Sequence, residues 1–129
     1  MNYIPAIGIG DLLSRPKFLG VVAVEHFGVA VAPNTVLHNT PEKGEHLSTV
    51  EEFSAGQPIT VRHTGVDPST VMARSRQILA NPKKYHAVAR NCQHTVSEIL
   101  KGIATSPVVV TLFIVAMVGV LLFFLLRQR

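Results

Sequence analysis

The sequence predicts a small α+β domain, an antiparallel sheet packed on helices, followed by one C-terminal transmembrane helix. Residues 21–32 are dense in valine and partly alternate, and residues 35–39 repeat this pattern after a Pro-Asn turn. Together they predict a β-hairpin. Residues 92–103 place apolar side chains at helical spacing, which predicts an amphipathic helix. Residues 108–126 form an apolar run that contains no charged residue.

These features divide the chain of 129 residues into four parts. We assign a folded domain to residues 1–104, a linker to 105–107, a transmembrane anchor to 108–126 and a basic tail to 127–129. The domain is long enough for a small core without disulfides. A single cysteine excludes an intramolecular disulfide and fits a reducing compartment. The formal charge of +4 includes two arginines in the tail, which argues against nucleic-acid binding.

Shorter strands and loops are expected around the hairpin. The stretch from Gly10 to Leu13 is interpreted as a turn that enters a short strand. Residues 40–47 are polar and are expected to form a loop. Residues 58–63 are expected to form a further strand. Residues 85–89 are interpreted as an extended or irregular segment leading into the helix at 92.

Two more helices are predicted from their end signals. Ser48 and Glu51 match the capping box, which predicts a short helix that is closed by Gly56. Asp67 stands before a proline at the first helical position, and this helix is expected to end at Asn81, before another proline.

The C-terminal apolar run is predicted to cross a membrane. Its 19 residues are interrupted only by Thr111 and Gly119, and at about 1.5 Å per residue they match the hydrocarbon thickness of a bilayer. Uniform apolarity argues against a buried core helix, which would need a polar face towards water. We therefore expect a single-pass tail anchor. Charges around the span are weakly asymmetric, and the unpaired cysteine favours a cytosolic domain.

The only cysteine, Cys92, follows Asn91, a good N-cap residue, and so lies in the first turn of a predicted helix. The helix dipole there favours a thiolate, although a buried structural cysteine is the alternative. A thiol nucleophile needs a base. His26 and His38 fall on neighbouring predicted strands in apolar surroundings, where an idle polar group is costly. One imidazole would take the thiol proton and the other would orient it, unless each histidine is structural.

No metal site or cofactor is expected. One cysteine with scattered histidines lacks the ligand spacing of a zinc site. The pair Gly8 and Gly10 lacks the third glycine and the lysine of a phosphate loop. His94 points to another side of the helix from Cys92 and is interpreted as structural. His46, His63 and His86 are assigned no role.

Three segments taken together resemble a known family. They are the strand segment His26-Phe27-Gly28-Val29, the histidine twelve residues later at His38, and Asn91-Cys92-Gln93-His94 at a helix start. This order and spacing is similar to that of the lecithin:retinol acyltransferase-like proteins, with the HRAS-like suppressor phospholipases and acyltransferases as the closest subgroup. The resemblance covers residues 8–104. The family motif usually has Glu and Phe where Gln93 and Thr95 stand, and Trp is common in place of Phe27.

The resemblance implies a circularly permuted papain-like fold and a thiol enzyme without a cofactor. Cys92 would be the nucleophile, His26 the general base and His38 the residue that orients the base. The substrate would be a membrane glycerophospholipid, whose acyl group passes to Cys92 as a thioester. Water would then release it, as in a phospholipase, or an amine or hydroxyl would accept it, as in an acyltransferase. The anchor, about sixteen residues beyond Cys92, would hold the site near the lipid surface.

Two alternatives stay open at this point. The same Cys-His pair could serve a peptidase, amidase or isopeptidase, because fold does not fix the substrate. The chain could instead be an inactive membrane-tethered module that binds a partner. An acid-free basic run is interpreted either as a contact for anionic headgroups or as a solvated face. Its members are Arg74, Arg76, Lys83, Lys84 and Arg90.

Overall fold

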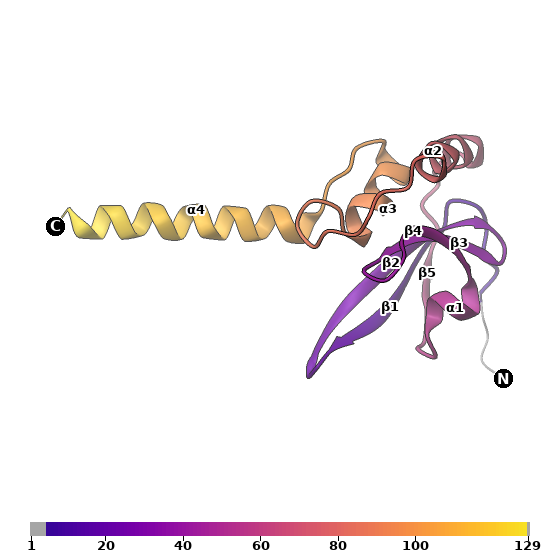
Figure 1. Cartoon of the computed structure of the whole chain (residues 1–129), viewed down its shortest axis with the longest axis horizontal. Helices are drawn as coiled ribbons and strands as arrows, with labels where there is room; N and C mark the ends of the chain where they lie inside the picture. The colour runs from indigo at the N-terminus through magenta and orange to yellow at the C-terminus, as the bar shows by residue number, and fades with distance from the viewer. Residues whose placement is uncertain (1–4, 129) are drawn as a thin grey trace.

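A computed structural model describes residues 5–128 and shows an α+β fold, which confirms the predicted class (Figure 1). Its single five-stranded sheet is antiparallel throughout, in the order β4-β3-β2-β1-β5. The strands are β1 (Leu12–Leu19), β2 (Val22–Ala32), β3 (Thr35–Thr40), β4 (Gly44–Thr49) and β5 (Thr60–Arg62). The predicted β2–β3 hairpin and the strand at β5 are therefore confirmed. The strand expected after Gly10 is also present, but β1 has eight residues and pairs along its whole length with β2, which the sequence did not predict.

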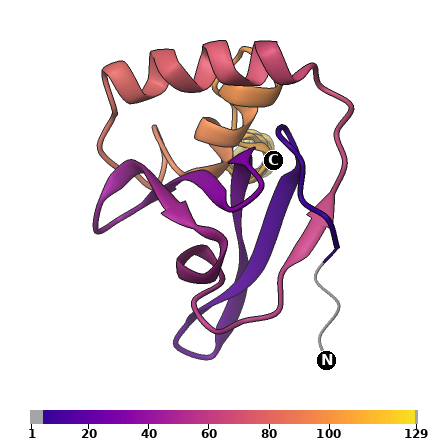
Figure 2. The same cartoon turned by 90° about the vertical axis from the view of Figure 1, so that its right-hand side faces the viewer.

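Three helices cover the two faces of this sheet (Figure 2): α1 (Val50–Ser54), α2 (Pro68–Ala80) and α3 (Cys92–Lys101). The fourth helix is α4 (Pro107–Arg127). Alternate strand residues point to opposite faces, so Val29 and Leu37 pack with Ile99 of α3 and with α2. Their neighbours on the other face pack around Phe53 of α1. Asp67 caps α2, which ends before Asn81 as predicted.

The structure differs from the sequence prediction between residues 40 and 56. Residues 44–49 form β4 and not a loop, because they pair with β3 from Thr35↔Thr49 to Thr40↔Gly44. The capping box of α1 is formed by Thr49 and Glu52, one residue later than predicted. Pairing of β4 with β3 extends through Ser48, which places that residue in the strand and moves the helix start forward.

The junction between α3 and α4 spans residues 102–106 and is therefore longer than the predicted linker of residues 105–107. Gly102 ends α3 with a positive φ of 77°, so Ile103 lies outside the helix and is exposed. Ser106 is buried and caps α4. The side-chain carbonyl of Gln93 accepts hydrogen bonds from the Ser106 hydroxyl and from the backbone N–H of Val108. The start of α4 is therefore joined directly to the residue after Cys92.

The helix α4 projects away from the domain (Figure 1). It has 21 residues, none of them buried, and it is long and apolar enough to span a membrane. The predicted C-terminal apolar helix is confirmed in this sense.

Candidate active site

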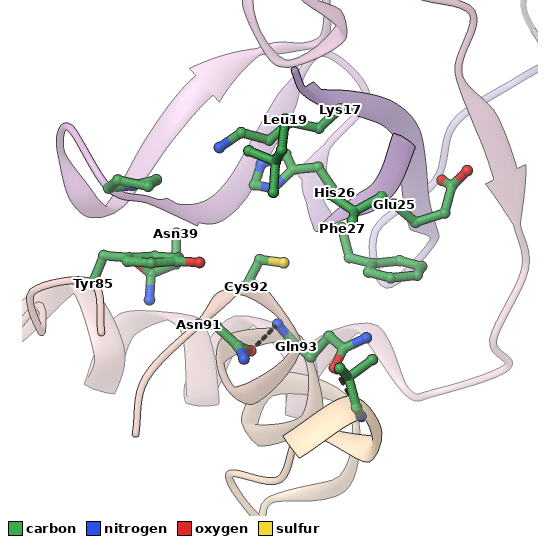
Figure 3. Close-up of a pocket in the computed structure, with 13 residues that line it drawn as sticks. Lys17, Leu19, Glu25, His26, Phe27, Asn39, Tyr85, Asn91, Cys92 and Gln93 are labelled. Carbon is green, nitrogen blue, oxygen red and sulfur yellow. Dashed lines mark hydrogen bonds between the residues drawn. The ribbon is translucent and has the colours of Figure 1, made fainter. Parts of the chain in front are cut away.

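Cys92 is the first residue of α3, and side-chain hydrogen bonds hold the N-terminal end of this helix. The side-chain carbonyl of Asn91 accepts from the backbone N–H of Gln93 at 2.9 Å and from that of His94 at 3.3 Å (Figure 3). The His94 ring in turn accepts from the backbone N–H of Asn91 at 3.1 Å. The predicted N-cap is thus confirmed, and the interpretation of His94 as a structural residue agrees with this contact.

Cys92 and His26 line the same cavity, which has a volume of about 490 Å³ and lies between α3 and the β1–β2 hairpin. Figure 3 shows the Cys92 side chain between the helices and the strands, with His26 on the opposite wall. Apolar parts of the wall include Leu19, Val24 and Val108, and polar residues complete the lining, among them Lys17, Glu25 and Asn39. This volume lies in the usual range for small-molecule sites.

The two predicted histidines form a buried pair. His26 Nε2 lies 2.9 Å from His38 Nδ1, and both side chains are almost fully buried. The Phe53 ring contacts both imidazoles, with centroids 5.4 Å from His26 and 5.2 Å from His38. The absent side chain of Gly28 makes this packing possible, because a Cβ there would lie 2.9 Å from the Phe53 ring and 2.5 Å from a methyl group of Val36.

A third residue extends the pair. Ser48 Oγ lies 2.9 Å from His38 Nε2 and 3.2 Å from the backbone carbonyl of Thr49. When the hydroxyl donates to Thr49, Ser48 accepts from His38 Nε2–H. A neutral imidazole carries one N–H, so in this arrangement His38 Nδ1 accepts from His26 Nε2–H and His26 Nδ1 is the basic nitrogen.

The structure brings the Cys92 thiol and the His26 imidazole into one cavity, with His38 behind His26, but over residues 5–128 no hydrogen bond joins the thiol to either ring. Catalytic hydrogen bonds are often long before substrate binds. The Cys92 thiol and the His26 imidazole therefore lie on the walls of one cavity without a direct hydrogen bond.

Burial keeps all three groups neutral. It raises the pKa of Cys92, and the backbone N–H groups of Phe27 and Gln93 lower it by less. Burial, followed by the charge of Arg15, lowers the pKa of His26 to about 4. Burial, followed by His46, lowers the pKa of His38 to about 3. The backbone N–H groups at the helix terminus lower the pKa of the Cys92 thiol, in the direction that was expected, but burial outweighs them and the net shift is upward.

We expect Cys92 to react slowly with iodoacetamide at neutral pH, at a rate that rises about tenfold per pH unit until the raised thiol pKa is reached. The measurement is mass spectrometry of the full chain over time. An exposed comparison is Val88→Cys in a Cys92→Ser background, which should react faster at every pH. A rate plateau for Cys92 at acidic pH would contradict this, since it would show a preformed thiolate.

Sequence reasoning missed Glu45, a buried carboxylate that fixes the segment before Cys92. One oxygen accepts from the Arg90 guanidinium (Nε at 2.7 Å) and from the Thr95 hydroxyl at 2.9 Å. The other accepts from the backbone N–H of Lys83 at 2.8 Å. Arg90 also pairs with Glu98. No local pattern predicts this cluster, because Glu45 lies fifty residues before Thr95.

The predicted basic run does not form one exposed face. Arg90 is buried by the ion pairs just described. Arg74 donates to the backbone carbonyl of Ile99 at 3.0 Å and covers Gly102. Arg90 is therefore not available for the headgroup contact that was one interpretation of the run, and Arg74 is half-buried.

The role of Ser48 was also missed, since the sequence placed it in a capping box. The alternation of side chains along a strand could have indicated this contact. His46 and Ser48 are two residues apart in β4 and therefore lie on the same face of the sheet. His46 is paired with His38 in the register, and their ring centroids are 4.3 Å apart. Recognising residues 44–49 as a strand would have directed both side chains to the histidine pair.

No protein-family model and no curated protein matches the chain. Within residues 5–128, no group of His, Cys, Asp and Glu side chains is arranged to hold a metal ion.

Proposed function

We propose that the chain is a membrane-anchored thiol enzyme of the lecithin:retinol acyltransferase-like type, with the permuted papain-like fold of that family. It would act as a phospholipase or acyltransferase on glycerophospholipid esters. One observation carries the proposal: the cavity of Cys92 and His26 is walled by Val108 of α4. An acyl chain that leaves a bilayer beside α4 meets apolar walls before it reaches the thiol. The unpaired cysteine favours a cytosolic domain, where thiols stay reduced.

The proposed chemistry uses the proton arrangement of the histidine pair. Cys92 Sγ attacks the ester carbonyl carbon while His26 Nδ1 takes the thiol proton. The hydrogen bond from His26 Nε2–H to His38 supports the resulting imidazolium. The ester C–O bond then breaks, and the proton passes from His26 to the departing lysolipid oxygen. Water, an amine or a hydroxyl attacks the thioester, gives its proton to His26, and Cys92 leaves and regains that proton.

The first test is intact-mass analysis of the full chain after brief incubation with phosphatidylcholine vesicles. A fatty-acyl mass increase on the wild type that is missing from Cys92→Ala is expected. His63→Ala is a matched control, because this exposed imidazole contacts Asp11 and does not line the cavity. It should form the adduct as the wild type does. Absence of both the adduct and released fatty acid would contradict the proposal.

A second candidate function is supported by one observation. The neutral Cys92 thiol has no hydrogen bond to His26 in the part of the chain that the structure describes, as expected for an inactive membrane-tethered module. If lipid gives no adduct, treatment with a peptide vinyl sulfone, a reagent that labels reactive thiols, distinguishes the peptidase or amidase hypothesis from the inactive module. Labelling of Cys92 that depends on His26 would favour a peptidase or amidase, and no labelling would favour the module.

Ser48→Ala is expected to lower kcat about tenfold or more and to leave KM unchanged. Loss of the acceptor for His38 Nε2–H permits the opposite tautomers, in which His26 carries its proton on Nδ1 and is no longer a base. The nitrogen chemical shifts of the two imidazoles should report the change of tautomer. Ser48→Thr should restore both. Ser54→Ala is the control, since that hydroxyl bonds only within α1 and its turn.

An unchanged tautomer in Ser48→Ala, together with normal turnover, would show that Ser48 does not orient the pair. A merely structural role would lower stability without moving the imidazole shifts, so the two measurements distinguish positioning from packing.

A further inference from the structure

The end of the β1–β2 hairpin is an exposed apolar surface, which we call the hairpin tip and define as residues 18–24. Every residue in it is exposed, and its sequence, FLGVVAV, contains no polar side chain. Phe18 is 59% exposed, Leu19 58% and Val21 fully exposed. Adjacent apolar side chains in this number mark an interaction site on a protein surface, unlike single scattered ones.

The hairpin tip is a regular projection of the sheet. Antiparallel pairing continues to Phe18↔Ala23 and Leu19↔Val22, and Gly20 turns the chain with a φ of 63°. The other half of β2 is buried in the domain core, whereas its first four residues are exposed. Strand pairing thus holds the apolar side chains outside the core in a fixed arrangement.

The position of the hairpin tip relative to α4 identifies its partner. Leu19 and Val24 of the tip line the Cys92 cavity together with Val108 in the first turn of α4. Figure 1 shows the tip as the part of the sheet that reaches farthest towards the side from which α4 leaves the domain. A bilayer crossed by α4 therefore begins beside the hairpin tip.

Charged residues stand at the base of the hairpin tip and not within it. Lys17 precedes the tip on β1 and Glu25 follows it on β2, and the register pairs Lys17 with Val24. A lysine at this depth can keep its ammonium group among lipid phosphates while its stem covers apolar surface. The change from charged to wholly apolar residues corresponds to the boundary between headgroups and acyl chains.

We propose that the hairpin tip inserts into the leaflet that α4 enters, as a second membrane contact of the domain. Strands rise about 3.4 Å per residue, so three residues on each strand reach roughly 10 Å, the depth to which interfacial elements insert. Insertion moves four apolar side chains from water to the boundary of the acyl chains, namely those of Phe18, Leu19, Val21 and Val22. The insertion turns the mouth of the cavity towards the lipid surface and does not depend on the chemistry of Cys92.

Depth-dependent fluorescence quenching tests this proposal in the full chain. In a Cys92→Ser background, Val21→Cys carries an environment-sensitive fluorophore, and the protein is reconstituted in phosphatidylcholine vesicles with lipids that bear a nitroxide near the headgroup. Emission from position 21 should shift to the blue and be quenched at least twofold. Gln77→Cys on the exposed side of α2 is the matched negative control, and Val115→Cys in α4 is the positive control.

A variant provides an independent test. Phe18→Asp should reduce the quenching at position 21 by half or more, because a carboxylate opposes insertion, whereas Gln77→Asp should not change it. A label at position 21 that behaves like the one at position 77 overturns the proposal. A blue shift without quenching by lipid nitroxides, lost when the protein is diluted with lipid, also overturns it and assigns the tip to contact with a second copy of the chain. Neither measurement uses acyl transfer, so failure of the proposed enzymatic function would leave both results intact.

Discussion

Cys92→Ala is expected to abolish the acyl-enzyme and to lower lipid turnover about a thousandfold or more. The sulfur forms the bond to the acyl carbon in the proposed reaction, and alanine offers no nucleophile. Release of fatty acid from phosphatidylcholine vesicles measures the rate. The thermal unfolding midpoint in detergent should change little, because the side chain lines a cavity and leaves the Asn91 cap of α3 intact.

His26→Ala should reduce turnover nearly as much, and the double variant should be no slower than Cys92→Ala. Residues that act as a unit in one step are strongly non-additive. His86→Ala is the matched control, because that exposed ring only accepts backbone N–H groups in its own turn. The proposed roles of the thiol and its base would be contradicted if the two substitutions reduced turnover multiplicatively in the double variant. They would also be contradicted if either single variant kept most of its turnover.

Glu45→Ala is expected to lower the free energy of unfolding by about 3–5 kcal/mol, the usual cost of removing one partner from a buried ion pair. The change leaves Arg90 without its buried carboxylate and removes the acceptor for Thr95. Denaturant unfolding of the full chain in mild detergent measures it. Activity should fall as well, since this cluster joins β4 to the segment that leads into Cys92.

Glu42→Ala is the control for Glu45→Ala, because it removes an exposed carboxylate three residues earlier in the chain. Its effect on unfolding should stay within about 0.5 kcal/mol. The free energy of unfolding of Glu45→Gln should lie between those of the two alanine variants, since an amide oxygen still accepts hydrogen bonds but carries no charge. Equal stability of the two alanine variants would show that the buried pair makes no net contribution.

Elements with local signals were predictable from the sequence. The Asn91 cap before α3, the Asp67 cap of α2 and the apolar run of α4 each lie within a few residues of the structure that they define. The contact between His26 and His38 follows from the hairpin that places them on adjacent strands. These predictions are confirmed because the information that fixes each element is contained in the element itself.

Features that depend on distant partners were not predictable. Strand β4 carries buried polar side chains, so its sequence resembles a loop until Glu45 is seen to meet Arg90. The protonation of Cys92 likewise depends on burial by other elements, which a helix-terminus argument leaves out. The place of Ser48 beside His38 requires the β3–β4 register, which no local motif encodes.

The bond between Gln93 and the start of α4 bears on how such an enzyme would encounter its lipids. A flexible tether would let the domain swing between neighbouring bilayers, but this junction joins Gln93, the residue after Cys92, to the start of α4. With the proposed anchor and chemistry, the protein would search one leaflet by lateral diffusion and would not hop between vesicles. Its kinetics would then follow the mole fraction of substrate in its own membrane, and the bulk lipid concentration would have no influence.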